Sequence, residues 1–261
     1  RKMINDLLII DPQVDFCEKD GSVFISNSDN KTKKLGKLIK KISDQLKTVH
    51  VSLNIRNILN VSHPKMWINQ ENFHPRPFTQ ITTEDIESGK WKTENPKFLN
   101  IIKKYISKLE TIEKYKFCVW PYHCLIGSRG STITNPIFDE LCDWEINKTE
   151  TQINYILRGK NPYAEEFSVI KSSKSNNINK IFIESFKTSK YLFIAGFSFS
   201  HYIISTIKTI SDHFSETENK KIIILLDLLN IDNECGFEMN YEKFLLDLKN
   251  KGVSIIYSSD I

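Results

Sequence analysis

The sequence lacks any apolar run long enough to cross a lipid bilayer. Its longest apolar stretches, Leu7 to Ile10 and Ile222 to Leu226, have the length of buried strands, whereas a transmembrane helix needs roughly 20 residues. The N-terminal residues run directly into the first of these stretches and show no apolar region of a secretory signal. We therefore expect no insertion into a membrane.

Cysteine is scarce and follows no regular spacing. An odd number of cysteines in a chain of this size argues against a secreted fold built on disulfides. We expect free thiols and an intracellular, reducing compartment, either the cytosol or the mitochondrial matrix. The five cysteines are Cys17, Cys118, Cys124, Cys142 and Cys235.

A strong excess of one charge is also missing, since 36 lysines and arginines face 32 aspartates and glutamates. The resulting net charge of +4 permits contact with RNA or an acidic partner but does not demonstrate it. Hydrophobic residues make up 40% of the chain and charged residues 26%, the balance of a folded globular protein. The length predicts one large domain spanning residues 1–261.

Apolar runs alternate along the chain with segments of helical periodicity. Strands alternating with amphipathic helices predict a three-layer α/β/α fold around a mostly parallel sheet, with the functional site at the carboxyl ends of the strands. The long stretch from Asn54 to Glu94 interrupts the alternation and is predicted to be a functional or binding loop. The predicted strands are Asn5–Asp11, Thr48–Leu53, Phe117–Trp120, Lys190–Ala195, Lys220–Asp227 and Val253–Tyr257, and the predicted helices are Lys31–Leu46, Pro96–Leu109, Ser200–Phe214 and Asn240–Asn250.

Polar motifs follow several of the predicted strands. Taken in order, they resemble the motifs of the nicotinamidase/isochorismatase-like cysteine hydrolases, and the block that begins at Trp120 is the most specific of them. The motifs are Asp11-Pro12-Gln13-Val14-Asp15-Phe16, Ser52-Leu53-Asn54 with His63-Pro64-Lys65-Met66-Trp67, His74-Pro75-Arg76-Pro77-Phe78-Thr79 and Gly89-Lys90-Trp91, Trp120-Pro121-Tyr122-His123-Cys124-Leu125-Ile126-Gly127, Arg158-Gly159-Lys160-Asn161-Pro162, and Ala195-Gly196-Phe197-Ser198-Phe199-Ser200-His201-Tyr202.

The resemblance implies an aspartate that carries protons, a lysine and a nucleophilic cysteine. Asp11 matches the aspartate, whereas the lysine position holds Arg158 and the cysteine position holds Tyr202. Arginine keeps the charge of lysine without its compact geometry. A phenol with a pKa of about 10 cannot replace an activated thiolate, and its ring would occupy the space that a substrate carbonyl needs. These positions therefore predict a degenerate catalytic site.

The family also binds a divalent metal ion, and its ligand positions correspond to Asn54, Arg56, His63 and His123. An amide in place of a carboxylate and a permanent cation in place of an imidazole remove two ligands and repel a metal ion. We therefore predict no bound metal and no other cofactor.

Phe16 and Trp120 match aromatic residues that stack on the nicotinamide ring in this family. One interpretation is a remnant pocket formed by these two rings and Cys124. The other is that both rings simply pack in the core, as most buried aromatic residues do.

These matches and mismatches lead to a hypothesis of a catalytically inactive protein, with the hydrolase fold kept as a structural or binding component of a larger assembly. Its partners would be proteins, with a mitochondrial or ribonucleoprotein complex as one version, and a homo-oligomer is equally open. One alternative is an amidohydrolase that uses Asp11, Lys160 and a relocated thiol such as Cys124. Another is a regulator that binds a small ligand between Phe16 and Trp120 without turnover.

Overall fold

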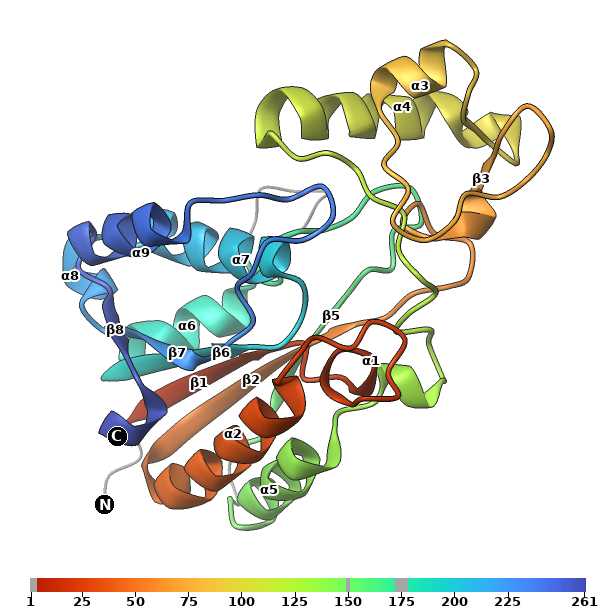
Figure 1. Cartoon of the computed structure of the whole chain (residues 1–261). Helices are drawn as coiled ribbons and strands as arrows, with labels where there is room; N and C mark the ends of the chain where they lie inside the picture. Colours follow the sequence, from red (N-terminus) through yellow and green to blue (C-terminus); the bar gives the residue numbers. More distant parts are fainter. Residues whose placement is uncertain (1–3, 149–150, 172–177) are drawn as a thin grey trace.

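The centre of the molecule is a six-stranded parallel sheet (Figure 1). The structure, a computed structural model, describes residues 4–148, 151–171 and 178–261. The predicted architecture is confirmed, because every pairing between neighbouring strands of this sheet is parallel. In spatial order the strands are β5 (Asn154–Arg158), β2 (Leu46–Asn54), β1 (Asn5–Ile10), β6 (Tyr191–Gly196), β7 (Ile222–Leu229) and β8 (Ser254–Ile256).

Helices cover both faces of the sheet (Figure 1). Side chains alternate across a strand, so Leu7 and Ile9 of β1 pack into one core while Leu8 and Ile10 pack into the other. The first core is shared with α2 (Ser28–Ile42) and α5 (Asn135–Ile146), and the second with α6 (Lys180–Thr188), α7 (Ser200–His213) and α9 (Tyr241–Asn250). Burial of every residue of β1 explains why the sequence shows a continuous apolar run there.

The long segment that follows β2 forms a lobe of its own and is not an irregular loop throughout (Figure 1). It holds a small antiparallel pair, β3 (Trp67–Ile68) with β4 (Lys92–Thr93), and the short helix α3 (Thr83–Glu87). Helix α4 (Leu99–Lys108) continues into a π-helical turn at Leu109–Glu113. A separate hydrophobic core stabilises this lobe, centred on Trp67, Ile102 and Phe117.

Shorter elements complete the chain. Helix α1 (Val14–Cys17) follows β1, and α8 (Glu216–Asn219) precedes β7. Among the residues described, no helix is both long and apolar enough to span a membrane. The 3₁₀ turns are Ser43–Gln45, Pro64–Met66, Pro96–Phe98, Arg129–Ser131 and Ser258–Asp260.

Several elements differ from the predicted secondary structure, and helices α5 and α6 were not predicted. Phe117–Trp120 is not a strand of the sheet, since Cys118 makes only an isolated bridge to Gln80 within the lobe. The edge strand β5 was not predicted, because its residues alternate between buried and exposed and form no apolar run.

The prediction of free thiols is wrong for two cysteines. Cys118 and Cys235 form a disulfide that joins the lobe to the loop between β7 and α9. Their separation of 117 residues hides the pairing from sequence spacing. Cys17, Cys124 and Cys142 are free. The expectation of a reducing compartment was based on free thiols, and the disulfide removes that support.

Candidate functional site

Asp11, Ser52 and Arg158 meet near the carboxyl ends of β1, β2 and β5. Asp11 lies between the other two. It is fully buried and has φ of +48°, a left-handed conformation that costs energy in a residue other than glycine. Its Oδ1 accepts a hydrogen bond of 2.6 Å from the Ser52 hydroxyl. The guanidinium of Arg158 forms an ion pair with the same carboxylate. Side chains, rather than backbone amides, therefore satisfy Asp11.

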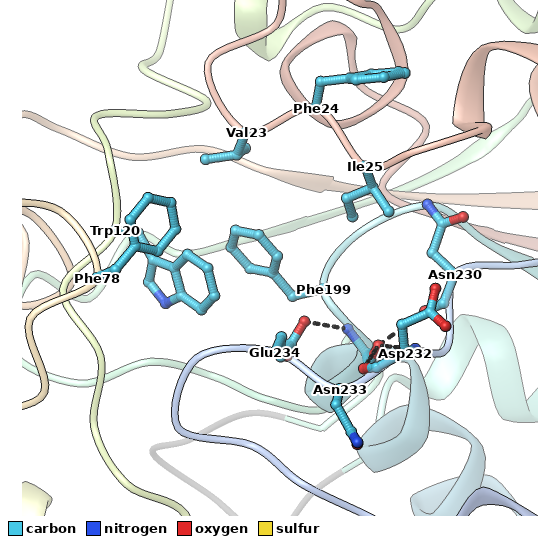
Figure 2. A pocket seen from close by; sticks show the side chains of 11 residues that line it. Val23, Phe24, Ile25, Phe78, Trp120, Phe199, Asn230, Asp232, Asn233 and Glu234 are labelled. Carbon is cyan, nitrogen blue, oxygen red and sulfur yellow. Dashed lines mark hydrogen bonds between the residues drawn. The ribbon is translucent and has the colours of Figure 1, made fainter.

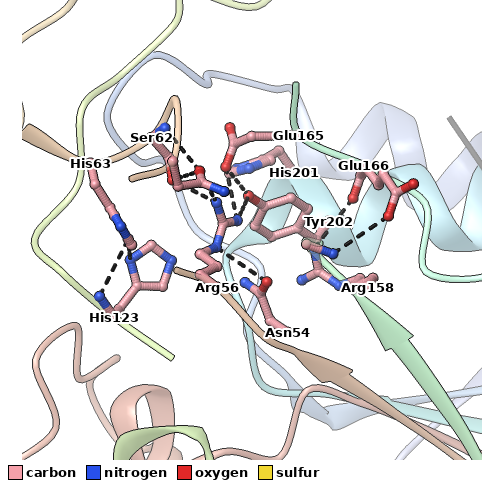
Figure 3. A network of polar contacts seen from close by, with 12 residues as sticks. Asn54, Arg56, Ser62, His63, His123, Arg158, Glu165, Glu166, His201 and Tyr202 are labelled. Atoms are coloured by element: carbon pink, nitrogen blue, oxygen red, sulfur yellow. Dashed lines mark hydrogen bonds and ion pairs between the residues drawn. The ribbon is translucent and has the colours of Figure 1, made fainter. Parts of the chain in front are cut away.

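Arg158 is the last residue of β5 and also contacts the first turn of α7. Its guanidinium carbon lies 4.0 Å from the centroid of the Tyr202 ring, within the range of a cation–π interaction (Figure 3). Gly159 follows with φ of +85°, and a Cβ at this position would lie 2.4 Å from Oδ1 of Asn54. Only glycine therefore lets the chain pass the end of β2 at this point.

Arg56 lies at the centre of the site and is 2% exposed. All five N–H donors of its guanidinium reach acceptors, so the side chain is fully satisfied although it is buried (Figure 3). The acceptors are Asn54 Oδ1 at 3.1 Å, Asn60 Oδ1 at 2.9 Å, Ser62 Oγ at 2.5 Å, Glu165 Oε1 at 2.9 Å and the Tyr202 hydroxyl at 2.7 Å.

Burial, together with the charges of this network, determines the protonation of Tyr202. Burial raises the pKa of the Tyr202 phenol well above its usual value, and Glu165 adds to the effect, although Arg56 and Arg158 oppose it. Burial also raises the pKa of Glu165, but the charges of Arg56 and His201 and the hydrogen bonds from Tyr202 and Arg56 together outweigh it and leave that pKa below the usual value. The phenol, which donates to the ionised Glu165, therefore stays protonated at neutral pH. A protonated and buried phenol is a poor nucleophile.

His63 and His123 lie side by side next to Arg56. The backbone N–H of His123 donates to Nε2 of His63 at 3.4 Å, and Nδ1 of His123 lies 2.8 Å from the carbonyl oxygen of Pro121. Burial, followed by the nearby Arg56 charge, lowers the pKa of His63 to about 4. The same two causes lower the pKa of His123 well below its usual value. Both imidazoles are therefore neutral at pH 7.

The four positions that correspond to metal ligands do not fit a divalent ion. Arg56 brings a fixed positive charge into the site and donates to Oδ1 of Asn54, the atom that a metal would need. Among the residues described, no group of three His, Cys, Asp or Glu side chains could hold a metal ion.

The aromatic pair predicted from the resemblance is interrupted by a third ring, that of Phe199. Phe199 stacks on Trp120 with 3.9 Å between ring centroids and meets Phe16 edge to face at 5.2 Å. Both rings line a small cavity of about 220 Å³, and Figure 2 shows the Phe199 ring next to the indole. The face of Trp120 that a stacked ligand would need is therefore covered by a side chain of the protein itself.

The groups required for an alternative enzyme do not come together in an active form. Cys124 is fully buried, and burial, followed by the charges of Asp15 and Asp11, raises the pKa of its thiol well above the usual value. Lys160 is exposed, whereas Asp11 is buried and pairs with Arg158. A thiol in this environment carries little of the reactive thiolate.

Two residues of the site escaped the sequence analysis. Glu165 belongs to no motif and lies 109 residues from Arg56, although a buried arginine does require an acidic partner. Phe199 lies within the motif that ends at Tyr202 and directly precedes α7. Its aromatic ring was the one feature of the sequence that could have indicated a role in the site.

No family model matches the sequence, and no curated protein matches it either. The structure, in contrast, is similar to solved nicotinamidases over nearly its whole length. The yeast nicotinamidase bound to the inhibitor nicotinaldehyde matches with a TM-score of 0.66 and 15% identity over 97% of this chain and 100% of that chain. A nicotinamidase from Acinetobacter matches with a TM-score of 0.60 and 13% identity over 100% and 99%. A Pyrococcus horikoshii pyrazinamidase in complex with zinc matches with a TM-score of 0.55 and 14% identity over 97% and 98%. The chain therefore has the nicotinamidase fold, as predicted.

Proposed function

We propose that this protein is a catalytically inactive form of the nicotinamidase fold that serves as a structural or binding component of a larger assembly. The fold alone does not decide between an active and an inactive protein, because one fold can carry many functions. The proposal depends on what the side chains at the carboxyl ends of the strands do.

The observation that carries the proposal is the closed network of Asp11, Arg158, Tyr202, Arg56 and Glu165. A proton-transferring aspartate must reach the substrate, but this carboxylate is engaged by Arg158 and Ser52. The position that the resemblance assigns to the nucleophile holds a protonated phenol. Each charged side chain of the network is paired with another member, as expected of a structural network rather than of a site prepared for a substrate.

Two alternatives have less support. An amidohydrolase with a relocated thiol would need a reactive Cys124, whose pKa is raised. A regulator that clamps a ligand between Phe16 and Trp120 would need Phe199 to leave its place. The proposal also includes a role in an assembly, with other proteins or further copies of this chain as partners and a mitochondrial or ribonucleoprotein complex with RNA contact as one version.

A nicotinamide deamidation assay tests the proposed inactivity. Ammonia release would be measured for the purified protein with and without added Zn²⁺, beside the variants Asp11→Ala and Arg158→Lys/Tyr202→Cys. We expect no release above the buffer rate from the natural chain, with or without the metal. Release that the natural chain catalyses and Asp11→Ala abolishes would overturn the proposal.

The assembly is tested separately, by the native mass of the tagged chain in extracts of the cells that produce it. We expect migration at a mass well above 30.4 kDa, the mass of one chain. Purified chain alone distinguishes a homo-oligomer from a complex with other proteins. Migration as a single chain in both samples would contradict this part of the proposal.

A further inference from the structure

Strand β5 forms one edge of the sheet and is open on its outer side. Within the residues described, β2 is its only neighbour in the sheet, and the carbonyl oxygen of Arg158 accepts a hydrogen bond from Ile55, just after β2. Backbone groups alternate in direction along a strand, so the N–H and C=O groups of Tyr155 and Leu157 point away from β2. These four groups have no hydrogen-bond partner in the part of the chain that the structure describes.

The edge lacks the features that usually protect an open strand. Proteins place lysine, proline or a bulge at such an edge, because it pairs readily with another strand. The pairing of β5 with β2 is regular, and the one charged residue of β5, Arg158, turns inward to Asp11. The side chains of Tyr155 and Leu157 are 44% and 49% exposed. Two large apolar side chains therefore lie in solvent beside unpaired backbone groups.

Helix α5 extends this apolar surface. Every fourth residue from Phe138 to Ile146 forms a stripe that lies apart from the residues of α5 in the core, with Phe138 44% exposed, Ile146 78% exposed and Cys142 between them. Glu145 of the same helix accepts a hydrogen bond of 3.0 Å from the backbone just before β5. Burial, followed by the charges of Glu145 and Cys142, raises the pKa of Tyr155. The stripe and the open edge are therefore one continuous surface.

We propose that two copies of this chain form a dimer through this surface, with their β5 strands antiparallel about a two-fold axis at Ile156. In this register Tyr155 lies opposite Leu157 of the partner subunit, and the outward N–H and C=O groups of the two residues bond to each other. Because the free groups are placed symmetrically about Ile156, the strand is complementary to a second copy of itself, as a two-fold interface requires. The two sheets become continuous, and the stripe of α5 meets its own copy on one face.

The area is compatible with a stable dimer. The four exposed side chains of β5 and the stripe are between 44% and 78% exposed. Large apolar side chains present on the order of 200 Å² each, so these four offer on the order of 400 Å² per copy. The strand edge and the polar residues around it need supply only a similar area to reach the roughly 800 Å² per partner of a standard interface. Asp139 and Asp143 lie beside the stripe and are exposed, so salt should strengthen the contact slightly by screening their repulsion.

Sedimentation velocity of the purified full chain tests the dimer. The inference rests on the assembly role in the proposed function, to which it assigns a partner, and does not depend on catalytic inactivity. We expect a species of twice 30.4 kDa, the mass of one chain. Leu157→Lys and Ile146→Lys place charges in the contact and should each raise the Kd of the dimer at least about tenfold. Both side chains are exposed, so circular dichroism should show folded variants. Leu246→Lys changes a side chain of α9 that is 57% exposed and should leave the Kd unchanged.

Cys142 reports where the contact lies. Of the three free cysteines, Cys17 and Cys124 are buried and Cys142 is not. A short bismaleimide should therefore link two copies through Cys142 in the natural protein and in Leu246→Lys, but not in Cys142→Ser or Leu157→Lys.

Two results would overturn the dimer. One is a purified chain that sediments as a monomer; a high native mass in extracts would then still support an assembly with other proteins, so the two proposals fail separately. The other is a dimer that Leu157→Lys does not dissociate and that Cys142 does not link, because its contact would lie on another surface.

Discussion

The guanidinium carbon of Arg158 lies 4.0 Å from the centroid of the Tyr202 ring, and the same guanidinium pairs with the carboxylate of Asp11. The three positions that the resemblance assigns to catalysis thus contact one another through an ion pair and a cation–π interaction. Each is at most 3% exposed. We therefore expect Asp11, Arg158 and Tyr202 to contribute to the free energy of unfolding.

Removing one partner of the Asp11–Arg158 pair should destabilise the fold strongly. Asp11→Asn leaves a buried guanidinium without its counter-charge, which typically costs about 3–5 kcal/mol. Arg158→Met should cost a similar amount, while the double variant should lose less than the sum of the two because no unpaired charge remains. Urea unfolding of the four proteins measures these differences. Losses that simply add would show that the two residues are not coupled.

An exposed ion pair provides the control for that cycle. Lys65 and Glu94 pair at 2.8 Å with side chains 44% and 41% exposed. Lys65→Met should change the free energy of unfolding by less than about 1 kcal/mol. A loss as large as that of Arg158→Met would mean that burial does not explain the difference.

Phe199→Ala should open the face of Trp120 to a ligand. The lost contacts and the cavity that remains should cost about 3–5 kcal/mol of stability. Because Phe199 stacks on the indole at 3.9 Å, its removal leaves room for a flat ring, and nicotinamide should then raise the melting temperature of the variant but not of the natural protein.

Phe186→Ala is the matched control for this experiment, since Phe186 is equally buried but belongs to the core on the other face of the sheet. It should lose comparable stability and show no response to nicotinamide. An equal response of both alanine variants would contradict a specific site beside Trp120.

How much of the fold the sequence reveals depends on burial. Strand β1 is buried along its whole length, so its apolar run predicts it directly. Strand β5 lies at the edge of the sheet and exposes Tyr155 and Leu157. Its sequence therefore shows no continuous apolar run. Phe117 is fully buried as well, but in the core of the lobe, so the same apolar signal wrongly predicts a strand of the sheet.

Motif order predicts which strand and helix ends meet at the candidate site, but it predicts neither Glu165 nor the contacts between the residues. Motif order places Asp11, Arg158 and Tyr202 at neighbouring strand and helix ends. The pairing of Arg56 with Glu165 depends on how the segment after β5 crosses the site, which no local pattern encodes. The disulfide escapes for the same reason, since its cysteines come from the lobe and from a distant loop.

Reduction of the Cys118–Cys235 disulfide should lower stability substantially. A bond that closes a loop of this length restricts the unfolded chain, which in the chain-entropy model is worth about 4–5 kcal/mol. Cys235→Ser, or the natural protein in dithiothreitol, should therefore unfold at lower urea concentration. Cys142→Ser removes a free thiol instead and should have little effect. Labelling of all five thiols under non-reducing, denaturing conditions would contradict the bond.

Stability should fall as the pH is lowered from about 6.5 towards 4. The pKa of His63 is lowered to about 4 in the folded protein, from 6.5 in an unfolded chain, and that of His123 is lowered well below its usual value. Between these values the unfolded state binds more protons, so protonation favours unfolding and stability rises with pH across the window. At about 1.4 kcal/mol per pKa unit, His63 alone accounts for a loss of about 3 kcal/mol on acidification.

The variant His63→Asn separates this effect from the titration of carboxylates, which begins lower on the pH scale. Asparagine can still donate to the carbonyl oxygens of Asn57 and Ile58 that His63 contacts, but it does not titrate. The slope of unfolding free energy between pH 6.5 and 4.5 should therefore be shallower in His63→Asn. His213 is exposed, and His213→Asn should keep the slope of the natural protein. Equal slopes in all three proteins would show that His63 accepts a proton as readily in the folded state as in the unfolded one.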